Sequence, residues 1–148
     1  MKIKLYILTY KNNQVLNEWL LKSLYESKFD EDVVEVNIIN NHSDFEIYPE
    51  YKDKKINVLH NVLRPDRSLA YVTKNWNEAI VNGFQSLKKP ECDAVITIQN
   101  DTVLLPTWYE YTLELLKKYN LIIFGAGDQF VVHTPASVRR IGLWDERF

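Results

Sequence analysis

The sequence predicts an α/β domain over residues 1–148, with a mostly parallel sheet flanked by helices. Short apolar runs rich in β-branched residues alternate with stretches whose apolar residues recur at helical spacing. The first two predicted strands are joined by a helical crossover, and a connection of this length usually makes such strands parallel. With 148 residues and 46% hydrophobic content, the chain can bury one core but not two.

The first half of the chain alternates regularly between the two patterns. We expect strands at residues 2–9, 33–39 and 55–60 and helices at residues 13–27 and 72–87. The first strand is a nearly continuous apolar run, and the first helix carries one apolar stripe from Val15 to Leu24. Residues 45–55 are expected to form a polar surface connection.

The second half continues the pattern with shorter elements. We expect strands at residues 93–99, 121–124 and 130–132 and helices at residues 108–119 and 135–141. Pro106 suits the start of the first of these helices, whose stripe is Trp108, Tyr111, Thr112, Leu115 and Tyr119. Thr134 can cap the second, with Pro135 in its first turn, and Gly142 can end it.

Composition excludes several partners. The 18 basic and 20 acidic residues give a formal charge of -2, and no basic tract favours nucleic acid or an anionic membrane surface. Apolar stretches are too short for a transmembrane segment, and the first ten residues resemble no signal peptide, so any membrane contact should be peripheral. Cys92 is the only cysteine, which fits a reducing, cytoplasmic compartment and a small buried residue.

Short polar side chains follow three of the predicted strands. They are Thr9, Tyr10 and Asn12 after the first strand, Asn40, Asn41, His42, Ser43 and Asp44 after the second, and Gln99, Asn100, Asp101 and Thr102 after the fourth. One such cluster would be ordinary turn chemistry. Three clusters at the carboxyl edge of a parallel sheet predict a ligand site.

A phosphate-bearing ligand at this edge would have to be held through a cation or a basic side chain. The chain has no Gly-rich phosphate loop, so a phosphate needs another counter-charge. Asp101 could hold Mg²⁺ or Mn²⁺, with Arg64 or Arg67 nearby. The histidines His42, His60 and His133 have no metal-site spacing and are expected to be structural, and Ser43 lacks the partners of a nucleophilic triad. Trp76 and Trp108 are expected in the core.

Five segments, in order, resemble glycosyltransferases of the GT-A fold, especially the large inverting family 2. Residues 6–12 (YILTYKN) are similar to the first strand and turn of that family, and residues 39–44 (INNHSD) are similar to its Asp-Asn-Gly-Ser-x-Asp segment. Residues 74–77 (KNWN) are similar to a helix start, and residues 98–102 (IQNDT) are similar to the metal-binding Asp-x-Asp region. Residues 138–148 (VRRIGLWDERF) are similar to the Ile-Gly-x-Phe-Asp-Glu-x-Phe segment. Asn40 and Gln99 stand where the family usually has aspartates. The Asn-Asp-Thr run at residues 100–102 resembles a variant found in rhamnosyltransferase-like members.

The resemblance implies a Rossmann-like GT-A domain that transfers a sugar from a nucleoside-diphosphate sugar to a hydroxyl group of an unidentified glycan or glycolipid. It implies that Asp101 contacts Mn²⁺ or Mg²⁺ and the diphosphate. The nucleoside pocket would be lined by Thr9, Tyr10, Asn12 and Asn40. Arg64 or Arg67 would reach phosphate, and Asn77, Gln99 and Asn100 would shape the sugar end.

The acceptor side is less complete than the donor side. Inverting members place an acidic catalytic base shortly after the last similar segment, and this sequence stops at Phe148. Either the chain is truncated, or it is a shortened paralogue, or Asp145 or Glu146 acts as the base. A structural turn is an equal interpretation of this pair.

Three alternatives stay open. A non-catalytic binding module would keep the nucleotide pocket without the transfer. An assembly subunit would pair an exposed sheet edge with another chain, as a homo-oligomer would. A nucleotidyltransferase is supported only by analogy of fold.

Overall fold

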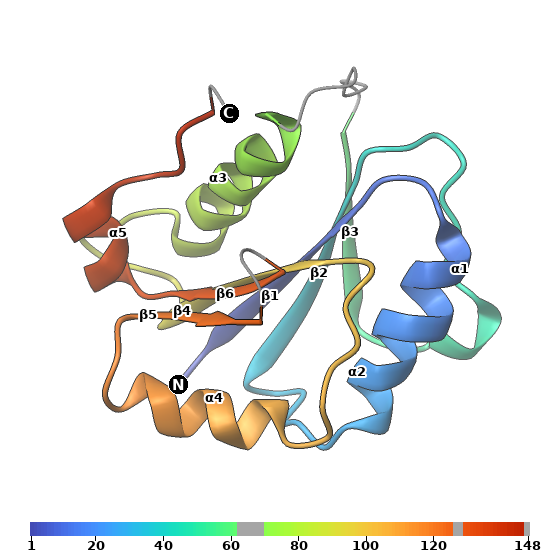
Figure 1. The fold of residues 1–148 in the computed structure, drawn as a ribbon, viewed down its shortest axis with the longest axis horizontal. Coiled ribbons are helices and arrows are strands. Elements are labelled where there is room, and N and C mark those ends of the chain that lie inside the picture. The colour runs from blue at the N-terminus through green and yellow to red at the C-terminus, as the bar shows by residue number, and fades with distance from the viewer. Residues whose placement is uncertain (62–69, 126–128, 147–148) are drawn as a thin grey trace.

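The computed structural model describes residues 1–61, 70–125 and 129–146. Its six-stranded sheet has the order β3-β2-β1-β4-β6-β5 (Figure 1). The strands are β1 Ile3–Thr9, β2 Val34–Asn40, β3 Ile56–His60, β4 Ala94–Gln99, β5 Leu121–Phe124 and β6 Phe130–His133. The helices are α1 Asn13–Val15, the π-helix η1 Leu16–Leu21, α2 Lys22–Glu26, the 3-10 turn η2 Pro49–Tyr51, α3 Ala70–Phe84, α4 Trp108–Leu116 and α5 Pro135–Ile141.

Strand direction places the predicted polar clusters at one edge of the sheet. The neighbours β3, β2, β1 and β4 are parallel, while β6 runs antiparallel to β4 and β5. The register pairs Thr9 with Asn40, Leu8 with Gln99 and Asn40 with His60, so four strands end together. The predicted α/β fold with a mostly parallel sheet is confirmed.

Helices cover both faces of the sheet (Figure 1). One face packs against the helical segment 13–26 and α4, and its core includes Leu5, Leu20 and Trp108. The other face packs against α3 and α5 through Tyr6, Ile80 and further buried side chains. Alternate residues of the central strand thus serve opposite cores, which explains the continuous apolar run of β1.

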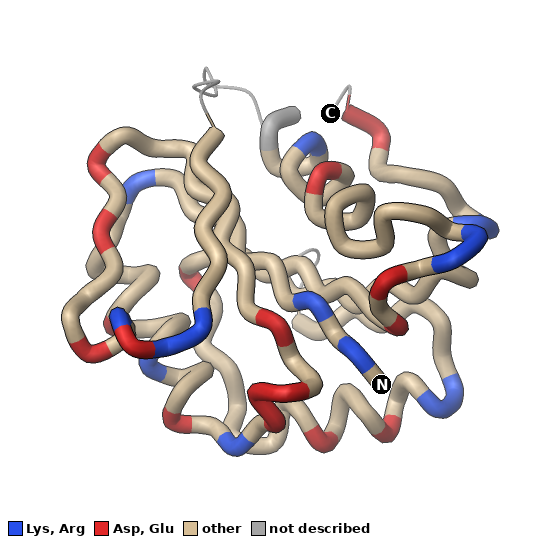
Figure 2. Tube along the Cα trace, turned by 180° about the vertical axis from the view of Figure 1, so that it is seen from behind, with Lys and Arg blue, Asp and Glu red and all other residues tan. Residues whose placement is uncertain are grey.

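Charged side chains lie around the periphery. Figure 2 shows acidic and basic residues interspersed along the helices and connections. Lys4 is an exception, because it is buried within β1 and its ammonium lies 3.0 Å from the Glu91 carboxylate. Over the described part of the chain, no helix has both the length and the apolar character needed to cross a bilayer.

The first predicted helix is present, but its middle is π-helical. Within that segment Asn17 is fully buried and donates to the carbonyls of Asn13 at 2.7 Å and Glu46 at 2.9 Å. Its Oδ1 accepts from the backbone of Tyr48 at 2.8 Å. Asn17 therefore ties the connection after β2 to the helix, and the wider π-turn accompanies this inserted polar contact.

The predicted stripe of α4 is wrong at two positions. Tyr111 is 57% exposed and Tyr119 is 55% exposed, and the helix ends at Leu116 before Tyr119. The face of α4 that carries Tyr111 lies beside β5, the last strand of the sheet, so no further strand covers it. Trp108 is buried as predicted, and its indole donates to Ser27 Oγ at 2.8 Å.

Two other helix ends are informative. The helix α3 ends at Phe84, so Leu87, which the spacing placed in it, lies beyond its end. The predicted ends of α5 are confirmed, because Thr134 Oγ1 accepts from the Ser137 amide and Gly142 follows the helix with φ 81°. Positive φ is strained for residues with a side chain, so glycine suits that position.

Gly83 sets the distance between α3 and β4. A Cβ atom there would lie 2.3 Å from Val95 Cγ2. Alanine favours a helix over glycine by about 1 kcal/mol, but relieving this overlap should cost more. We expect Gly83→Ala to lower the free energy of urea unfolding by about 1–2 kcal/mol. Val95→Ala should destabilise the Gly83→Ala protein less than it destabilises the parent, because it removes the atom that overlaps the new Cβ. A Gly83→Ala protein as stable as the parent would contradict this packing.

Candidate functional site

Backbone hydrogen bonds hold the loops at the strand ends side by side. The amide of Asn41 donates to the carbonyl of Thr9 at 3.0 Å, and the amide of Asn100 donates to Leu8 at 3.1 Å. On the outer side, Asn61 donates to Asn40 at 2.8 Å. The loops after β2, β3 and β4 therefore extend the sheet by one residue each beside the end of β1, which fixes their relative positions.

Thr9 lies at the centre of this edge. It is 2% exposed, and its hydroxyl accepts from Asn100 Nδ2 at 3.2 Å. Its carbonyl also accepts from Asn41 Nδ2 at 3.3 Å. A cavity of about 70 Å³ opens here, lined by Leu8, Thr9, Tyr10, Asn41, Val72, Gln99 and Asn100. The predicted residues after β1 and β4 thus share one polar depression.

The turn after β1 is left-handed at two successive residues, Lys11 with φ 56° and Asn12 with φ 62°. Asn12 Oδ1 accepts from the Val15 amide at 3.3 Å and so caps the following helix. Just before this turn, the ring of Tyr10 meets the ring of His42 edge to face at 5.7 Å. An aromatic pair from the loops after β1 and β2 therefore lies at the sheet edge, directly before the left-handed turn.

Asn40 contacts its own loop. It is 4% exposed, its Nδ2 donates to the His42 carbonyl at 2.7 Å, and its Oδ1 accepts from the His42 amide at 3.1 Å. Its Nδ2 also lies 3.0 Å from His60 Nδ1. These contacts shape the loop that carries His42, whereas a direct contact of Asn40 with a ligand stays a prediction.

A polar cluster that the sequence did not indicate joins β3 to α3. Asn61 Nδ2 lies 2.9 Å from Asn41 Oδ1, 3.0 Å from Asn75 Oδ1 and 3.2 Å from Glu78 Oε2. Asn75 is buried, and its Nδ2 has no partner within the described residues. Asn61 directly follows the third predicted strand, so the rule applied to the other three strands could have found it.

The turn after β4 presents one carboxylate. Asp101 is exposed, while the Thr102 amide donates to the Gln99 carbonyl at 3.2 Å across the turn. The Thr102 hydroxyl is buried and has no partner within residues 1–61, 70–125 and 129–146. Those ranges contain no group of three or more His, Cys, Asp or Glu side chains that could hold a metal ion. Arg64 and Arg67, predicted to reach phosphate, lie outside the described residues.

Asn77 fastens the segment after α5 to α3. Its side chain is 6% exposed, accepts from the Trp144 amide at 2.8 Å and donates to the Trp144 carbonyl at 2.8 Å. Its Nδ2 also donates to Glu146 Oε1 at 2.9 Å. The structure brings Asn77 together with Trp144 and Glu146, and its predicted place at the sugar end of the site stays a prediction. Asp145, like Glu146, is exposed.

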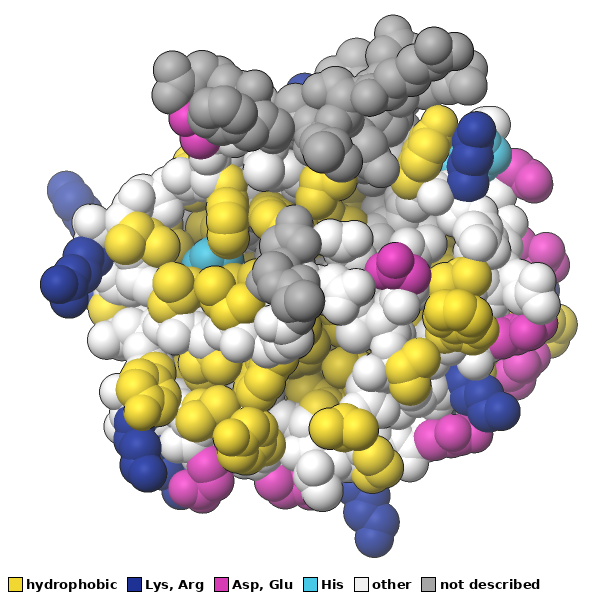
Figure 3. All heavy atoms as spheres, viewed as in Figure 1, with side chains coloured by type: hydrophobic (Ala, Val, Ile, Leu, Met, Phe, Trp, Pro, Cys, Tyr) yellow, Lys and Arg dark blue, Asp and Glu magenta, His cyan; other side chains and the backbone are white. Residues whose placement is uncertain are grey.

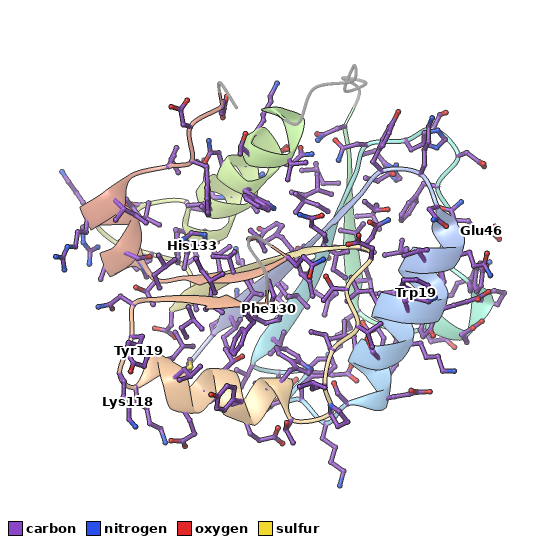
Figure 4. All side chains as sticks on the ribbon, in the orientation of Figure 1. Trp19, Glu46, Lys118, Tyr119, Phe130 and His133 are labelled. Carbon is purple, nitrogen blue, oxygen red and sulfur yellow. The ribbon has the colours of Figure 1, made fainter. Side chains whose placement is uncertain are left out.

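Aromatic packing strengthens the same attachment. The ring of Trp144 lies 4.9 Å from the ring of Trp76 and 6.0 Å from that of His133. Trp144 Nε1 donates to His133 Nε2 at 3.4 Å. His133 lies at the end of β6 (Figure 4) and is 2% exposed, and burial lowers its pKa to about 4. This histidine is therefore neutral at pH 7 and supports the segment after α5.

Because the pKa of His133 is lower in the folded state than its ordinary value of 6.5, stability should depend on pH. Between pH 6.5 and 4 the unfolded chain binds a proton that the folded chain does not, so stability falls as the pH falls. We expect a loss of about 2 kcal/mol between pH 7.5 and pH 5, measured by urea unfolding. The loss should be smaller in His133→Gln; equal losses in both proteins would contradict the assignment.

No protein family model and no curated protein matches this sequence. Solved structures do match its fold. S. aureus TarS 1–349 has a TM-score of 0.69 at 15% identity, covering 99% of this chain and 51% of TarS 1–349. The mannosyltransferase PcManGT from Pyrobaculum calidifontis, in complex with GDP-Man and Mn²⁺, has a TM-score of 0.67 at 11% identity, covering 98% of this chain and 48% of its own.

TarS 1–349 in complex with UDP-GlcNAc also matches, with a TM-score of 0.60 at 14% identity. At these identities the likeness shows a shared fold. The chain spans about half the length of the TarS 1–349 and PcManGT structures.

Proposed function

We propose that this chain is a GT-A nucleotide-sugar-binding domain over residues 1–148, and that it serves the metal-dependent, inverting transfer of a sugar to a hydroxyl acceptor. The observation that carries the proposal is the convergence of four strand ends into one hydrogen-bonded polar edge, with the exposed Asp101 beside it. The fold is shared with structures that hold GDP-Man with Mn²⁺ and UDP-GlcNAc, which supports this choice of ligand.

The loops after β1 and β2 would receive the nucleoside. The Tyr10 and His42 rings offer an aromatic surface on which a base can stack. Thr9, Asn12 and Asn40 would line this pocket, and hydrogen bonds within the protein hold their side chains in place. The cavity beside Thr9 is small, so most of the nucleotide would lie over the loops.

The loop after β4 would receive the diphosphate and the sugar. Asp101 is one exposed carboxylate, and Mg²⁺ or Mn²⁺ binds readily through one or two carboxylates together with substrate phosphates and water. The single carboxylate therefore fits a cation that arrives with the nucleotide, and this cation would neutralise charge that develops on the departing diphosphate. Gln99 and Asn100, which directly precede Asp101, would shape the sugar end, and Arg64 or Arg67 remains a proposed phosphate contact.

The segment after α5 would supply the acceptor side. A carboxylate of Asp145 or Glu146 would accept the proton of the attacking hydroxyl, and that hydroxyl oxygen would form the new bond to the sugar as the diphosphate leaves. Asn77 holds one oxygen of Glu146 and both backbone groups of Trp144. In this arrangement Asn77 positions the carboxylate, and the acceptor itself remains unidentified.

A module that binds a nucleotide sugar without transferring it is the second candidate. It is favoured by the engagement of the Asn40 and Asn77 side chains in contacts within the protein. The two candidates differ in product: only the transferase should release free nucleotide from UDP-GlcNAc or GDP-mannose when acceptor hydroxyl compounds are present.

Calorimetric titration with UDP, GDP and dTDP, each with and without Mn²⁺, tests the proposal. We expect one nucleotide to bind, and to bind more tightly with Mn²⁺, because Asp101 would hold the cation that accompanies the phosphates. The corresponding monophosphate should bind more weakly and with a smaller effect of Mn²⁺. Absence of binding by all three diphosphates would contradict the proposed function.

A further inference from the structure

The side chain of Asn40 has both of its donors engaged within the protein. Its Oδ1 accepts from the His42 amide at 3.1 Å, and its Nδ2 donates to the His42 carbonyl at 2.7 Å. A backbone amide only donates and a carbonyl only accepts, so these contacts fix which end of the side chain is the nitrogen. Nδ2 also lies 3.0 Å from His60 Nδ1. Two acceptors therefore take the two hydrogens of Nδ2, and Asn40 can offer a nucleobase no donor.

The loop after β2 fixes the tautomer of His42. The backbone amide of Asp44 donates to His42 Nδ1 at 3.0 Å. An amide N–H has no lone pair to offer, so Nδ1 is the acceptor and the neutral ring carries its proton on Nε2. The donor from Asn40 sets His60 in the same way. Each of the two imidazoles therefore presents an Nε2–H donor at this edge of the sheet.

His42 is the donor nearer to the proposed nucleoside pocket. Its ring lies 5.7 Å from that of Tyr10, which lines the cavity beside Thr9. His60 ends β3, one strand farther from β1 in the sheet order, and its ring meets that of Phe45. The Tyr10 and His42 rings are 82° apart, so a base can stack on only one of them and meets the other with its edge. Stacking on Tyr10 leaves the Nε2–H of His42 for that edge.

The order of the strands determines which edge of a base would meet His42. In the proposed function the diphosphate lies over the loop after β4, and β1 separates β4 from β2. A nucleotide that extends from β4 across β1 points the base edge farthest from its ribose toward the loop after β2. That edge carries an oxygen in uracil, thymine and guanine, but an amino group in cytosine and adenine.

Charge does not distinguish these bases, so direct contacts must. Every nucleoside diphosphate carries the same two phosphates, and Figure 3 shows the described basic and acidic side chains interspersed around the rim of the face that it presents. An N–H donor that meets an oxygen gains a hydrogen bond. The same donor facing an amino group leaves two donors opposed and without partners, which disfavours binding.

We propose that His42 selects the base of the nucleotide. Its Nε2–H donates to O4 of uracil or thymine or to O6 of guanine, and it disfavours cytosine and adenine. This inference rests on the proposed function, because it takes the nucleoside to lie over the loops after β1 and β2. Asn40 is then a positioning residue, since it holds the backbone of His42 through both its amide and its carbonyl.

Calorimetry with two matched pairs of nucleotides in the presence of Mn²⁺ tests the proposal. UDP and CDP differ at this edge of the base, and so do inosine diphosphate and ADP. We expect the parent chain to bind the oxygen-bearing member of at least one pair about tenfold more tightly than the amino-bearing member.

Two variants of His42 separate selection of the base from support of the loop. In His42→Asn, Oδ1 can still accept from the Asp44 amide, as in an Asx turn, but no donor stands at the position of Nε2. In His42→Gln, the side-chain amide restores a donor at the ε position but no acceptor at the δ position. We expect His42→Asn to reduce the preference to about twofold or less and His42→Gln to keep most of it. His60→Asn removes the other imidazole donor and should leave the preference unchanged.

The outcomes separate this inference from the function on which it rests. A preference that survives in His42→Asn and is lost in His42→Gln would assign His42 to the loop alone and overturn the inference. Equal binding of both members of each pair by the parent chain would overturn it too, while Mn²⁺-dependent binding lost in Asp101→Ala would still support the proposed function. Binding of no nucleotide by the parent chain would contradict the proposed function and the inference together.

Discussion

Replacing Asp101 with alanine is expected to weaken Mn²⁺-dependent binding of the preferred nucleoside diphosphate at least about 100-fold, or about 2.7 kcal/mol. Asp101 is the exposed carboxylate of the turn after β4, and its neighbours Gln99 and Asn100 carry no charge. Without Asp101, the site would lack the charged side chain proposed to hold the cation, so Mn²⁺ would no longer strengthen nucleotide binding. Calorimetry with and without Mn²⁺ measures the loss directly.

Two controls make the Asp101 result specific. Asp101→Asn keeps the size of the side chain and removes its charge, so it should lose most of the Mn²⁺ effect as well. Asp53→Ala removes another exposed aspartate, which lies before β3 and therefore at the end of the sheet away from the proposed site. This variant should leave binding unchanged. Unchanged Mn²⁺-dependent affinity in Asp101→Ala would remove the assignment of this residue to the cation.

Replacing Asn77 with alanine is expected to lower the free energy of unfolding by about 3 kcal/mol and to release the segment after α5. The variant loses two hydrogen bonds to the backbone of Trp144 and one to Glu146. Trp144 is half-buried against Trp76, so its backbone groups would lack partners in a place with little water. Hydrogen exchange should show rapid exchange of the Trp144 amide.

Asn82→Ala is the matched control for Asn77, because it removes another asparagine side chain from α3. It should leave exchange at Trp144 slow. Asn77→Asp retains an acceptor for the Trp144 amide but places a second negative charge beside Glu146, so it should also release the segment. Slow exchange at Trp144 in Asn77→Ala would show that aromatic packing alone holds the segment.

Periodicity was sufficient to predict the sheet and most helices, because each element buries one face and its spacing records that face. It failed where burial depends on which elements are neighbours. Tyr111 has helical spacing with Trp108, yet it lies beside the edge strand β5 and is exposed. The π-helical turn around Asn17 was equally hidden, because it depends on partners about 30 residues away in the chain.

The site shows the same division. That Thr9 and Asn100 come together was predictable, because parallel strands end at one edge. The role of Asn77 was not, since its partners Trp144 and Glu146 lie 67 and 69 residues away and no local spacing relates them. Asn61 could have been predicted as a site residue, because it directly follows a predicted strand as the other site residues do. Its contacts with Asn75 and Glu78 could not have been predicted from the sequence.

Nuclear magnetic resonance of the labelled chain tests the central claim most directly, because it locates a bound nucleotide residue by residue. On titration with the nucleoside diphosphate that binds, in the presence of Mg²⁺, we expect the amide signals of Thr9, Tyr10, Asn41, Asn100 and Asp101 to shift together. Signals at the opposite end of the sheet, such as Lys2 and Ile56, should stay in place. Shifts confined to that opposite end would contradict a nucleotide site at the strand ends.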